Sequence, residues 1–286
     1  MKGAFEALIK PKYQEHAALK GVSFSLEKGT FNGLIGANGA GKTTLLKILS
    51  GLIPPSSGEA RVLGIDPFSR PLEFRRQISL VMGQKAQLWW DLAGQDAFDL
   101  LRAIYEIPRP VYKERLNTLA ELLDVKNHLQ TQIRRLSLGE RMKMELIGAL
   151  LHWPQIIFLD EPTIGLDVLA AAKLREFLRV FNHREKATII LTSHNMDDIE
   201  RLCERVLILR QGEMIFDGTP KKLTGSGEQQ LRVRFREQPT LGEVAAATGL
   251  AEKSISLADQ EDEEKKGLYY LNLEREQIVP TLQKLM

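Results

Sequence analysis

The stretch Gly36–Thr44 reads GANGAGKTT and fits the pattern G-x-x-x-x-G-K-[ST]. Before it, Phe31–Ile35 is short and mostly apolar, as in a buried strand, and after it Leu45–Leu49 is apolar, as at the start of a helix. A glycine-rich loop between a strand and a helix can wrap its N–H groups around phosphate oxygens. The alternative is a chance glycine-rich turn, which the strand and helix flanks argue against. The stretch therefore predicts that the chain binds a nucleoside triphosphate.

The residue types of this loop each have a chemical purpose. Lys42 is expected to reach the outer phosphates, and the Thr43 hydroxyl is expected to ligate Mg²⁺. Because it acts on the reacting phosphates, Lys42 also counts among the predicted catalytic residues. The nucleotide-binding residues predicted in the loop are Gly36, Ala37, Asn38, Gly39, Ala40, Gly41, Lys42, Thr43 and Thr44.

Length and composition bound the possible classes of protein. With 286 residues, 43% of them hydrophobic, the chain can bury one large core and is expected to carry a smaller second unit. Its net charge of +2 gives no basic excess, so nucleic acid is not an expected partner. Cys203 is the single cysteine and cannot form an internal disulfide. There is no secretory leader and no apolar run near the ~18 residues that cross a bilayer, so the chain is expected to be cytosolic.

Short apolar runs recur along the chain and predict the strands of a sheet. The runs are Phe31–Ile35, Ile78–Met82, Ile156–Leu159, Thr188–Thr192 and Val206–Leu209. Helical patterns separate the later runs, which predicts a mainly parallel sheet. From Ala4 to about Leu26 the sequence reads as two extended pieces around a polar turn, with Val22, Phe24 and Leu26 alternating against serines. This segment is expected to add an antiparallel edge.

A helical insert is expected to interrupt the sheet over about residues 85–153. Asp96–Ile107, closed by Pro108 and Pro110, reads as one helix of the insert, and Val111–Leu123 reads as the next. The pattern then returns to strand, so the insert lies between two strands of the same sheet.

The last part of the chain is expected to form a small α+β domain over residues 223–286. The hydrophilic stretch Gly225–Glu228 reads as a linker into it. The strands and helices expected beyond the linker are Leu231–Phe235, Leu241–Thr248, Ser254–Leu257, Leu268–Leu273 and a last helix from Glu276. The charged run DQEDEEKKG reads as a solvated hairpin loop.

Two adjacent carboxylates, Asp160 and Glu161, follow the buried run Ile156–Leu159. In open α/β sheets, ligands bind at the C-terminal ends of the strands, so these carboxylates are expected beside the phosphate loop. Successive residues of a strand face opposite sides. Asp160 is therefore predicted to ligate Mg²⁺, and Glu161 is predicted to polarise the water that attacks the γ-phosphate. The alternative is that the paired acids cap the following helix.

Further motifs stand around the phosphate loop in a set order. They are Tyr13 upstream, Gln84 after a strand, RRLSLGERMKME at Arg134–Glu145, PTIGLD at Pro162–Asp167 and TSH ending at His194. Together with the loop and the carboxylate pair, this order resembles the nucleotide-binding subunits of ABC transporters over about residues 4–222. The resemblance implies an α/β P-loop NTPase of the ABC type over residues 1–222, with a mixed sheet core, an antiparallel β edge and the helical insert. The small α+β domain follows it.

The resemblance also implies roles for single residues. Tyr13 would stack on adenine, Gln84 would sense Mg²⁺ and contact the membrane subunit, and His194 would hold the γ-phosphate as a catalytic residue beside Glu161. Taken alone, each has another interpretation: Tyr13 as a surface aromatic residue, Gln84 as a polar loop residue and His194 as a histidine beside a helix cap. Their shared order favours the functional interpretation. The implied cofactors are ATP and Mg²⁺, with Thr43, Gln84 and Asp160 as the metal ligands.

The segment Leu136–Arg141 departs from the family's usual LSGGQ, because it begins with LSLGE. Ser137 and Gly139 remain, and they precede a helix expected to reach about Trp153, so a hydroxyl and N-terminal amides can still meet a phosphate. Glu140 is favourable in the first turn of that helix. A carboxylate there would nevertheless repel a triphosphate unless it is turned away, and such repulsion would weaken ATP-driven closure.

In the family this segment acts on the nucleotide held by another subunit, which requires a head-to-tail dimer with two ATP molecules between the halves. One copy of each motif therefore predicts that the chain pairs with a second copy of itself or with a related ATPase subunit. The residues that the resemblance places on a nucleotide from this side are Ser137, Gly139, Glu140 and Asp167.

A transporter subunit without a membrane span needs a permease on a separate chain. Trp89, Trp90 and Asp91 are the predicted contact with it, although the two tryptophans would serve equally well as a roof over the helical insert. The motif order resembles that of bacterial export systems, which implies an exporter subunit at the cytoplasmic face of the cell membrane. The alternatives are a soluble ABC ATPase acting on nucleic acid or the translation machinery, and a low-turnover regulatory subunit that responds to nucleotide.

Overall fold

The computed structural model describes residues 17–83, 86–223, 228–235, 239–257, 268–274 and 281. The chain divides into two compact units, Met1–Gly218 and Thr219–Met286. The sequence analysis placed the boundary between residues 222 and 223. Each unit has its own sheet and its own apolar core.

The first unit is built on a six-stranded sheet with the strand order β2-β3-β4-β1-β5-β6. Its strands are β1 (Phe31–Ile35), β2 (Ile78–Met82), β3 (Ile156–Asp160), β4 (Thr188–Thr192), β5 (Arg205–Arg210) and β6 (Glu213–Gly218). The neighbours among β1 to β5 pair in parallel, and β6 pairs antiparallel to β5. The five apolar runs therefore form strands as predicted, and the sheet is mixed. Since β1 to β4 are parallel, their C-terminal ends share one edge of the sheet.

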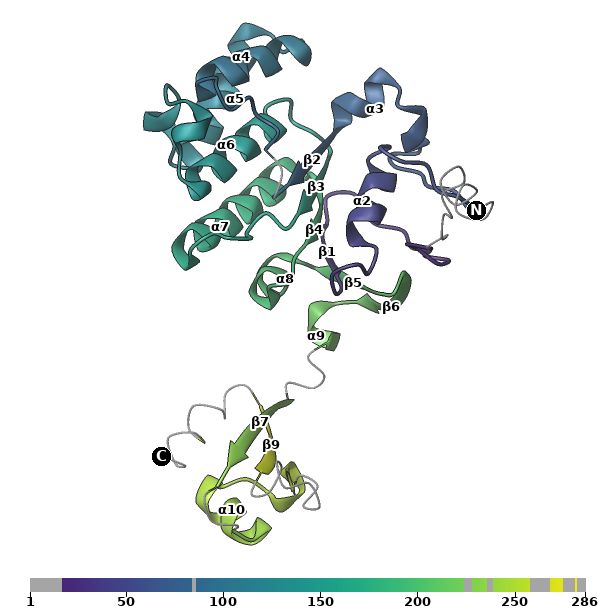
Figure 1. Cartoon of the computed structure of the whole chain (residues 1–286), viewed down its shortest axis with the longest axis vertical. Helices are drawn as coiled ribbons and strands as arrows, with labels where there is room; N and C mark the ends of the chain where they lie inside the picture. The colour runs from purple at the N-terminus through teal and green to yellow at the C-terminus, as the bar shows by residue number, and fades with distance from the viewer. Residues whose placement is uncertain are drawn as a thin grey trace, which may run out of the picture. The chain divides into compact units, whose positions relative to one another are not determined.

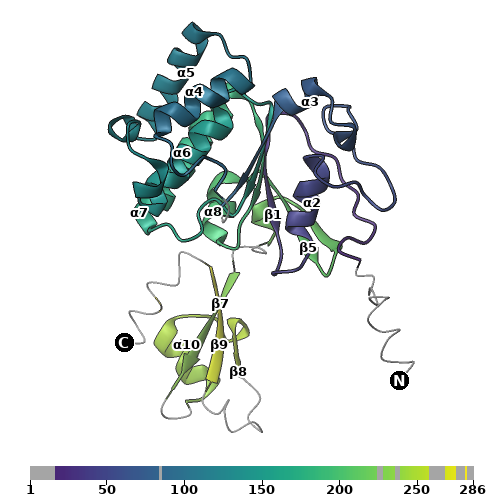
Figure 2. The ribbon, with the colours of Figure 1, turned by 45° about the horizontal axis from the view of Figure 1, so that its top comes forward.

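Helices lie on both faces of this sheet (Figures 1 and 2). One face carries α2 (Lys42–Leu49) and α3 (Leu72–Gln77). The other face carries α4 (Gly94–Ile104), α5 (Arg109–Leu122), α6 (Leu138–Leu150), α7 (Val168–Glu185) and α8 (Met196–Leu202). Because both faces are covered, β3 and β4 are buried at successive positions instead of alternating positions.

An apolar cluster fixes α2 against the sheet. Leu46 of α2 is 1% exposed, and Leu34 and Phe158 on the sheet are fully buried in the same cluster. Burying a side chain of this size stabilises the fold by about 1.5–3 kcal/mol. The start of α2 is therefore held at a set place relative to the ends of β1 and β3, where the phosphate loop and the carboxylate pair lie.

Several helix ends in the insert differ from the prediction, since α4 ends at Ile104 and not at Ile107, and α5 begins at Arg109 and not at Val111. Pro110 was predicted to close the first helix, which is wrong, because it lies in the first turn of α5. A proline there removes no intrahelical hydrogen bond and has the right φ. Helix α6 ends at Leu150 and not at about Trp153. Trp153 has a left-handed backbone with φ of 60°, and it precedes Pro154, which disfavours a helical residue before it.

The strand predicted at Val22–Leu26 is also wrong, since residues 17–30 contain no strand. Val22, Phe24 and Leu26 are half-buried and alternate with exposed residues, and they pack against the cluster beneath α2. Apolar residues at every second position show which side of an extended chain is buried, but they do not show that another strand pairs with it. The antiparallel edge of the sheet is β6. The first extended piece, residues 4–16, lies outside the described residues.

The second unit contains a three-stranded antiparallel sheet with the order β7-β9-β8. Its elements are α9 (Pro220–Leu223), β7 (Glu228–Arg234), α10 (Leu241–Thr248), β8 (Ile255–Leu257) and β9 (Leu268–Glu274). Val244 of α10 packs with Ile255, Tyr269 and Leu271 of the sheet. The predicted strands and the helix Leu241–Thr248 are thus present. Most of the predicted linker and, apart from residue 281, the last helix lie outside the described residues.

A half-buried histidine just after α6 contacts the sheet. His152 stacks on Tyr105 at 4.0 Å between ring centroids, and its Nε2 lies 3.0 Å from the Ile78 carbonyl oxygen. Burial lowers the pKa of His152 to about 4, and the nearby Arg115 adds to the lowering. The neutral ring is therefore the form that the fold selects.

We expect His152 to contribute to the loss of folding stability at acidic pH. Its folded pKa lies below its unfolded value, so its stabilisation is complete above about pH 6.5 and is lost as the pH falls toward 4. His152→Gln should reduce the loss of unfolding free energy over this pH range by about 1–3 kcal/mol, because glutamine does not titrate. Urea unfolding at several pH values measures it. His183→Gln on the exposed side of α7 is the control, and equal slopes in the two variants would contradict the expectation.

Candidate nucleotide-binding site

Helix α2 begins at Lys42, so the Lys-Thr-Thr end of the loop forms its first turn. The sequence analysis began the helix at Leu45, because apolar periodicity does not register the polar residues of a first turn. The N–H groups of a first helical turn have no partner within the helix. Together with the positive end of the helix dipole, they form a site that favours phosphate.

Two glycines of the loop have no room for a side chain. A Cβ on Gly36 would lie 2.4 Å from the carbonyl oxygen of Leu209. A Cβ on Gly41 would lie 2.6 Å from the carbonyl oxygen of Ala18, and φ of Gly41 is +105°. The loop can follow this tight path only with glycine at both positions.

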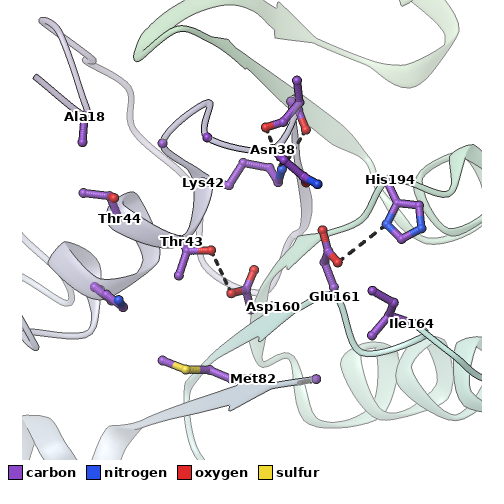
Figure 3. A pocket seen from close by; sticks show the side chains of 16 residues that line it. Ala18, Asn38, Lys42, Thr43, Thr44, Met82, Asp160, Glu161, Ile164 and His194 are labelled. Carbon is purple, nitrogen blue, oxygen red and sulfur yellow. Dashed lines mark hydrogen bonds and ion pairs between the residues drawn. The ribbon is translucent and has the colours of Figure 1, made fainter. Parts of the chain in front are cut away.

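A cleft of about 1010 Å³ lies over the loop, and Figure 3 shows the side chains that line it. The predicted site residues that line it are Gly36, Ala37, Asn38, Gly39, Gly41, Lys42, Thr43, Thr44, Asp160, Glu161 and His194. The other lining residues were not predicted from the sequence; they are Ala18, Lys47, Met82, Gly83 and Ile164. Ala40 is buried beneath the loop. The cleft therefore joins the phosphate loop to the ends of β2 and β3 and to the residues after β4.

Lys42 places its charge at the centre of the loop. Its side chain is buried, and its Nζ donates hydrogen bonds to the carbonyl oxygens of Gly36 at 2.7 Å and Ala37 at 3.1 Å. An ammonium held there has a further N–H group for a phosphate oxygen. The position agrees with the role predicted for this lysine.

Asp160 lies beside Thr43 at the start of α2 (Figure 3). The Thr43 hydroxyl donates to Asp160 Oδ2 at 3.0 Å, and the Thr192 hydroxyl donates to Asp160 Oδ1 at 2.6 Å. A hydroxyl and a carboxylate oxygen are the hard ligands that Mg²⁺ prefers, so this pair fits the metal. Among the described residues no group of three or more acidic, histidine or cysteine side chains could hold a metal. The arrangement suits an ion shared with substrate phosphates better than one in an all-protein cage.

Glu161 points away from Asp160 and toward His194 (Figure 3). Glu161 Oε2 lies 3.7 Å from His194 Nδ1. The backbone N–H of Glu161 donates to the Thr192 carbonyl oxygen at 3.1 Å and is 3.0 Å from the Thr192 hydroxyl. Glu161 has φ of 53°, a left-handed conformation that costs free energy and that surrounding contacts must hold in place. Such strain is concentrated at functional sites.

The alternative role of the two acids as helix caps does not match the structure. The next helix, α7, is capped by Asp167, whose Oδ1 accepts from the N–H of Ala170 at 2.8 Å. Asp167, one of the predicted nucleotide-binding residues, is not among the residues that line the cleft. Asp160 and Glu161 are therefore free for chemistry at the cleft.

The LSLGE segment begins α6 with a capping box. The Glu140 carboxylate accepts from the Ser137 backbone N–H at 2.9 Å and from the Ser137 hydroxyl at 2.8 Å. These two hydrogen bonds, the backbone one first, lower the pKa of Glu140. Leu138 lies against Gly165, where a Cβ would be 2.9 Å from Leu138 Cδ2. Ser137, Gly139 and Glu140 do not line the cleft of the same chain.

Two predicted residues, Tyr13 and Gln84, lie outside the described residues. The tryptophans beyond them are described: Trp89 is 44% exposed and Trp90 is 49% exposed. The Arg141 guanidinium of α6 lies over the Trp90 ring at 5.0 Å, a cation–π contact. Each tryptophan is covered over about half of its surface, which fits a roof over the insert, and exposes the rest, which leaves surface for a partner.

Comparison with known proteins decides the family. Residues 19–164, about half of the chain, match the family described as ABC transporter. The chain belongs to the ABC transporter family. This ABC protein is 33% identical over 206 residues to the ABC transporter ATP-binding protein NatA of Bacillus subtilis, covering 72% of this chain and 83% of NatA.

Other ABC relatives carry drug-resistance names. The linearmycin resistance ATP-binding protein LnrL of Bacillus subtilis is 33% identical over 215 residues, covering 75% of this chain and 68% of LnrL. The daunorubicin resistance ATP-binding protein DrrA3 of Streptomyces coeruleorubidus is 31% identical over 236 residues, covering 82% of this chain and 74% of DrrA3.

Solved ABC structures share the fold. The cbiO1 protein of Clostridium perfringens, part of the ABC transporter complex cbiONQ, superimposes with a TM-score of 0.67 at 25% identity, covering 73% of this chain and 84% of cbiO1. The dimeric ATP-binding cassette MJ0796, bound to ADP and Pi, superimposes with a TM-score of 0.64 at 25% identity, covering 71% of this chain and 90% of MJ0796.

The ABC resemblance seen in the sequence is therefore confirmed, and the chain is an ATP-binding and ATP-hydrolysing subunit of a transporter. ABC subunits of this kind dimerise and work with transmembrane partners, through which they associate with the membrane. In the described part of this chain, none of the helices has the length and apolar character needed to cross a bilayer.

Thr192 is the residue at the ABC site whose importance sequence reasoning missed. It is fully buried, it donates to Asp160, and its carbonyl oxygen accepts from the backbone of Glu161. The available signal was a threonine at the end of an apolar strand, two residues before His194. A polar residue at the C-terminal end of a parallel strand lies at the ligand-binding edge.

Proposed function

We propose that the chain powers export through a separate permease, as one of two ATPase subunits that hold two Mg-ATP molecules head to tail. The observation that carries the proposal is the convergence of Lys42, Thr43, Asp160, Glu161 and His194 on one cleft above the phosphate loop. The resistance names of the relatives LnrL and DrrA3 support export as the direction of transport.

The residues divide the work of hydrolysis. Lys42 and the N–H groups at the start of α2 hold the phosphates and offset their charge. Thr43 and Asp160, with Gln84 as a further ligand, would hold Mg²⁺, which would screen charge on the phosphates when bound. Glu161 accepts hydrogen bonds from the attacking water and orients it, and His194 donates to the γ-phosphate. Glu161 and His194 lie close enough to act on the same phosphoryl group.

The second subunit completes the site. Gly139 and the N-terminal amides of α6 supply donors to the γ-phosphate held by the partner's loop. The Ser137 hydroxyl joins them when it turns from the Glu140 carboxylate, to which it donates at 2.8 Å. The capping box binds the Glu140 carboxylate to the Ser137 N–H and hydroxyl, so the negative charge lies beside the groups that would face the incoming phosphate. The repulsion expected from an acid at that position stays a prediction, and Asp167 lies at the nearby start of α7.

A second cleft suits the permease. It has a volume of about 410 Å³ and is lined by residues that include Arg70, Arg75, Leu101, Tyr105 and Glu145. Gln87 and Leu88 also line it, directly before the exposed tryptophans Trp89 and Trp90. Apolar walls with a few charges, next to exposed aromatic side chains, are typical of a docking surface for a helix of a partner protein. We place the contact with the cytoplasmic side of the permease here.

The test is to tag the chain in its own cells, extract the membranes in mild detergent and identify the stoichiometric partners by mass spectrometry. Recovery of a multi-helix membrane protein would support the transporter subunit, and its transport assay would fix the direction. Recovery of ribosomal or nucleic-acid-associated partners alone, with the chain absent from membranes, would favour a soluble ABC ATPase. Robust ATP turnover argues against a regulatory subunit of low activity.

We expect Trp89→Ala and Trp90→Ala to lower recovery of the permease, because exposed tryptophans at the centre of an interface contribute most of its binding free energy. The expected loss is about 10-fold or more for the double variant. Ile215→Ala, which truncates an exposed side chain on β6, is the control. Unchanged recovery in the tryptophan variants would contradict the assignment of this surface.

A further inference from the structure

A buried carboxylate lies behind the proposed catalytic residues. Asp198, in the first turn of α8, is fully buried. Its Oδ2 accepts from the Thr163 hydroxyl at 2.6 Å and from the Ser193 hydroxyl at 2.7 Å. Its Oδ1 accepts from Arg175 Nη1 at 2.8 Å. A buried carboxylate is unfavourable unless it is paired and hydrogen-bonded, and here both of its oxygens are satisfied.

The donors come from the segments that carry the catalytic side chains. Thr163 lies two residues after Glu161, inside the turn closed by the hydrogen bond from the Ile164 N–H to the Glu161 carbonyl oxygen at 3.2 Å. Ser193 directly precedes His194. Both hydroxyls bind the same oxygen of Asp198. One oxygen atom therefore connects the turn after β3 to the segment after β4.

Helix capping does not explain this carboxylate. The cap of α8 is Asn195, whose side chain accepts from the N–H of Asp197 at 3.0 Å. Asp198 instead directs its side chain inward, where Arg175 of α7 neutralises its charge. The group therefore serves the contact between elements and not the start of its own helix.

We propose that Asp198 is a positioning residue for ATP hydrolysis. It holds the Glu161 turn and the His194 segment at the separation that brings Glu161 Oε2 within 3.7 Å of His194 Nδ1. This inference rests on the catalytic roles given to those two residues under the proposed function. Because Glu161 is in a left-handed conformation, its carboxylate direction depends on such support.

The test uses Thr163→Val and Ser193→Ala, each of which removes one donor to Asp198 and leaves the Asp198–Arg175 pair in place. Ser193→Ala also removes the acceptor of the Asn195 N–H, so Thr163→Val is the cleaner of the two variants. We expect kcat for ATP hydrolysis to fall about 10-fold in each, because small displacements of catalytic groups are costly. The KM for ATP should stay within about twofold, since the phosphate loop is untouched. The double variant should fall about as far as either single variant and not about 100-fold, because both act through one carboxylate.

Asp198→Asn and Asp197→Asn form a matched pair on the same helix. Asp197 is exposed, so its variant should keep wild-type kcat, whereas Asp198→Asn should lose at least as much kcat as the hydroxyl variants. If Asp198→Asn does not fold, the hydroxyl variants carry the test. Wild-type kcat in both hydroxyl variants, or independent losses that multiply, would overturn the proposal.

Glu161→Gln in the same assay separates the catalytic role of Glu161 from the positioning role of Asp198. Loss of turnover in Glu161→Gln together with wild-type kcat in Thr163→Val and Ser193→Ala would overturn the positioning role alone. Retained turnover in Glu161→Gln would overturn the catalytic assignment and the positioning role with it. Loss in all three, with the non-additive pattern, supports both.

Discussion

Glu161→Gln is expected to lower ATP turnover by about 10²- to 10⁴-fold while ATP binding persists, because an amide cannot accept a proton from the attacking water. The phosphate loop, Thr43 and Asp160 are unchanged in this variant, so they continue to hold the nucleotide. ATP that is bound but not cleaved should stabilise the head-to-tail pair by mass action. Light scattering with saturating Mg-ATP should then report a dimer.

Glu213→Gln, on exposed β6, is the control for the loss of one negative charge. It should keep wild-type turnover and the wild-type oligomeric state. Full turnover in Glu161→Gln would contradict the role of this carboxylate. A monomer at saturating Mg-ATP would contradict pairing with a second copy, once dependence on a different partner chain has been excluded.

The phosphate loop and the carboxylate pair could be predicted because their chemistry is contiguous in the sequence. Gly36 to Thr44 form one uninterrupted loop, and Asp160 and Glu161 are neighbours at the end of an apolar strand. The parallel sheet follows from apolar runs separated by helices, and such a sheet brings the ends of β1 and β3 to one edge. Local pattern and topology were therefore enough for this part of the site.

The supports of the site could not be predicted, because they join residues that are distant in the sequence. Thr192 meets Asp160 across two neighbouring strands, and Asp198 collects donors from three other segments. No periodicity reports such contacts. The alternation of half-buried and exposed residues at Val22–Leu26 is a second example of this limit. Burial on one side of a chain does not reveal whether a strand pairs with it.

The Glu140 carboxylate of the signature segment caps α6 in the structure. An acid in the signature segment was expected to repel a triphosphate. The capping box binds it to the Ser137 N–H and hydroxyl, and His128 Nε2 lies 3.3 Å from its other oxygen. These contacts keep the charged carboxylate at the start of α6 beside Ser137, so weakened ATP-driven closure stays a prediction.

Lys42→Met is expected to lower the affinity for ATP by about 100-fold or more, because charge-assisted hydrogen bonds to phosphate are lost from a buried position. Methionine has a similar length but no charge and no donor. The carbonyl oxygens of Gly36 and Ala37, which accept from Lys42 Nζ, belong to residues that are not buried and can turn to water. The free energy of unfolding without nucleotide should therefore change little.

Thermal unfolding with and without Mg-ATP separates Lys42→Met from Glu161→Gln. A ligand at 100 times its Kd stabilises the folded state by about 2.7 kcal/mol, so a wild-type chain and Glu161→Gln should both show a raised Tm with nucleotide. Lys42→Met should show almost no rise in Tm with nucleotide. Lys28→Met, on the exposed turn before β1, should behave as wild type. A full nucleotide-induced rise in Lys42→Met would mean that the backbone N–H groups at the start of α2 hold the phosphates without this lysine. Lys42 would then stabilise only the transition state of hydrolysis, and its replacement would lower kcat alone.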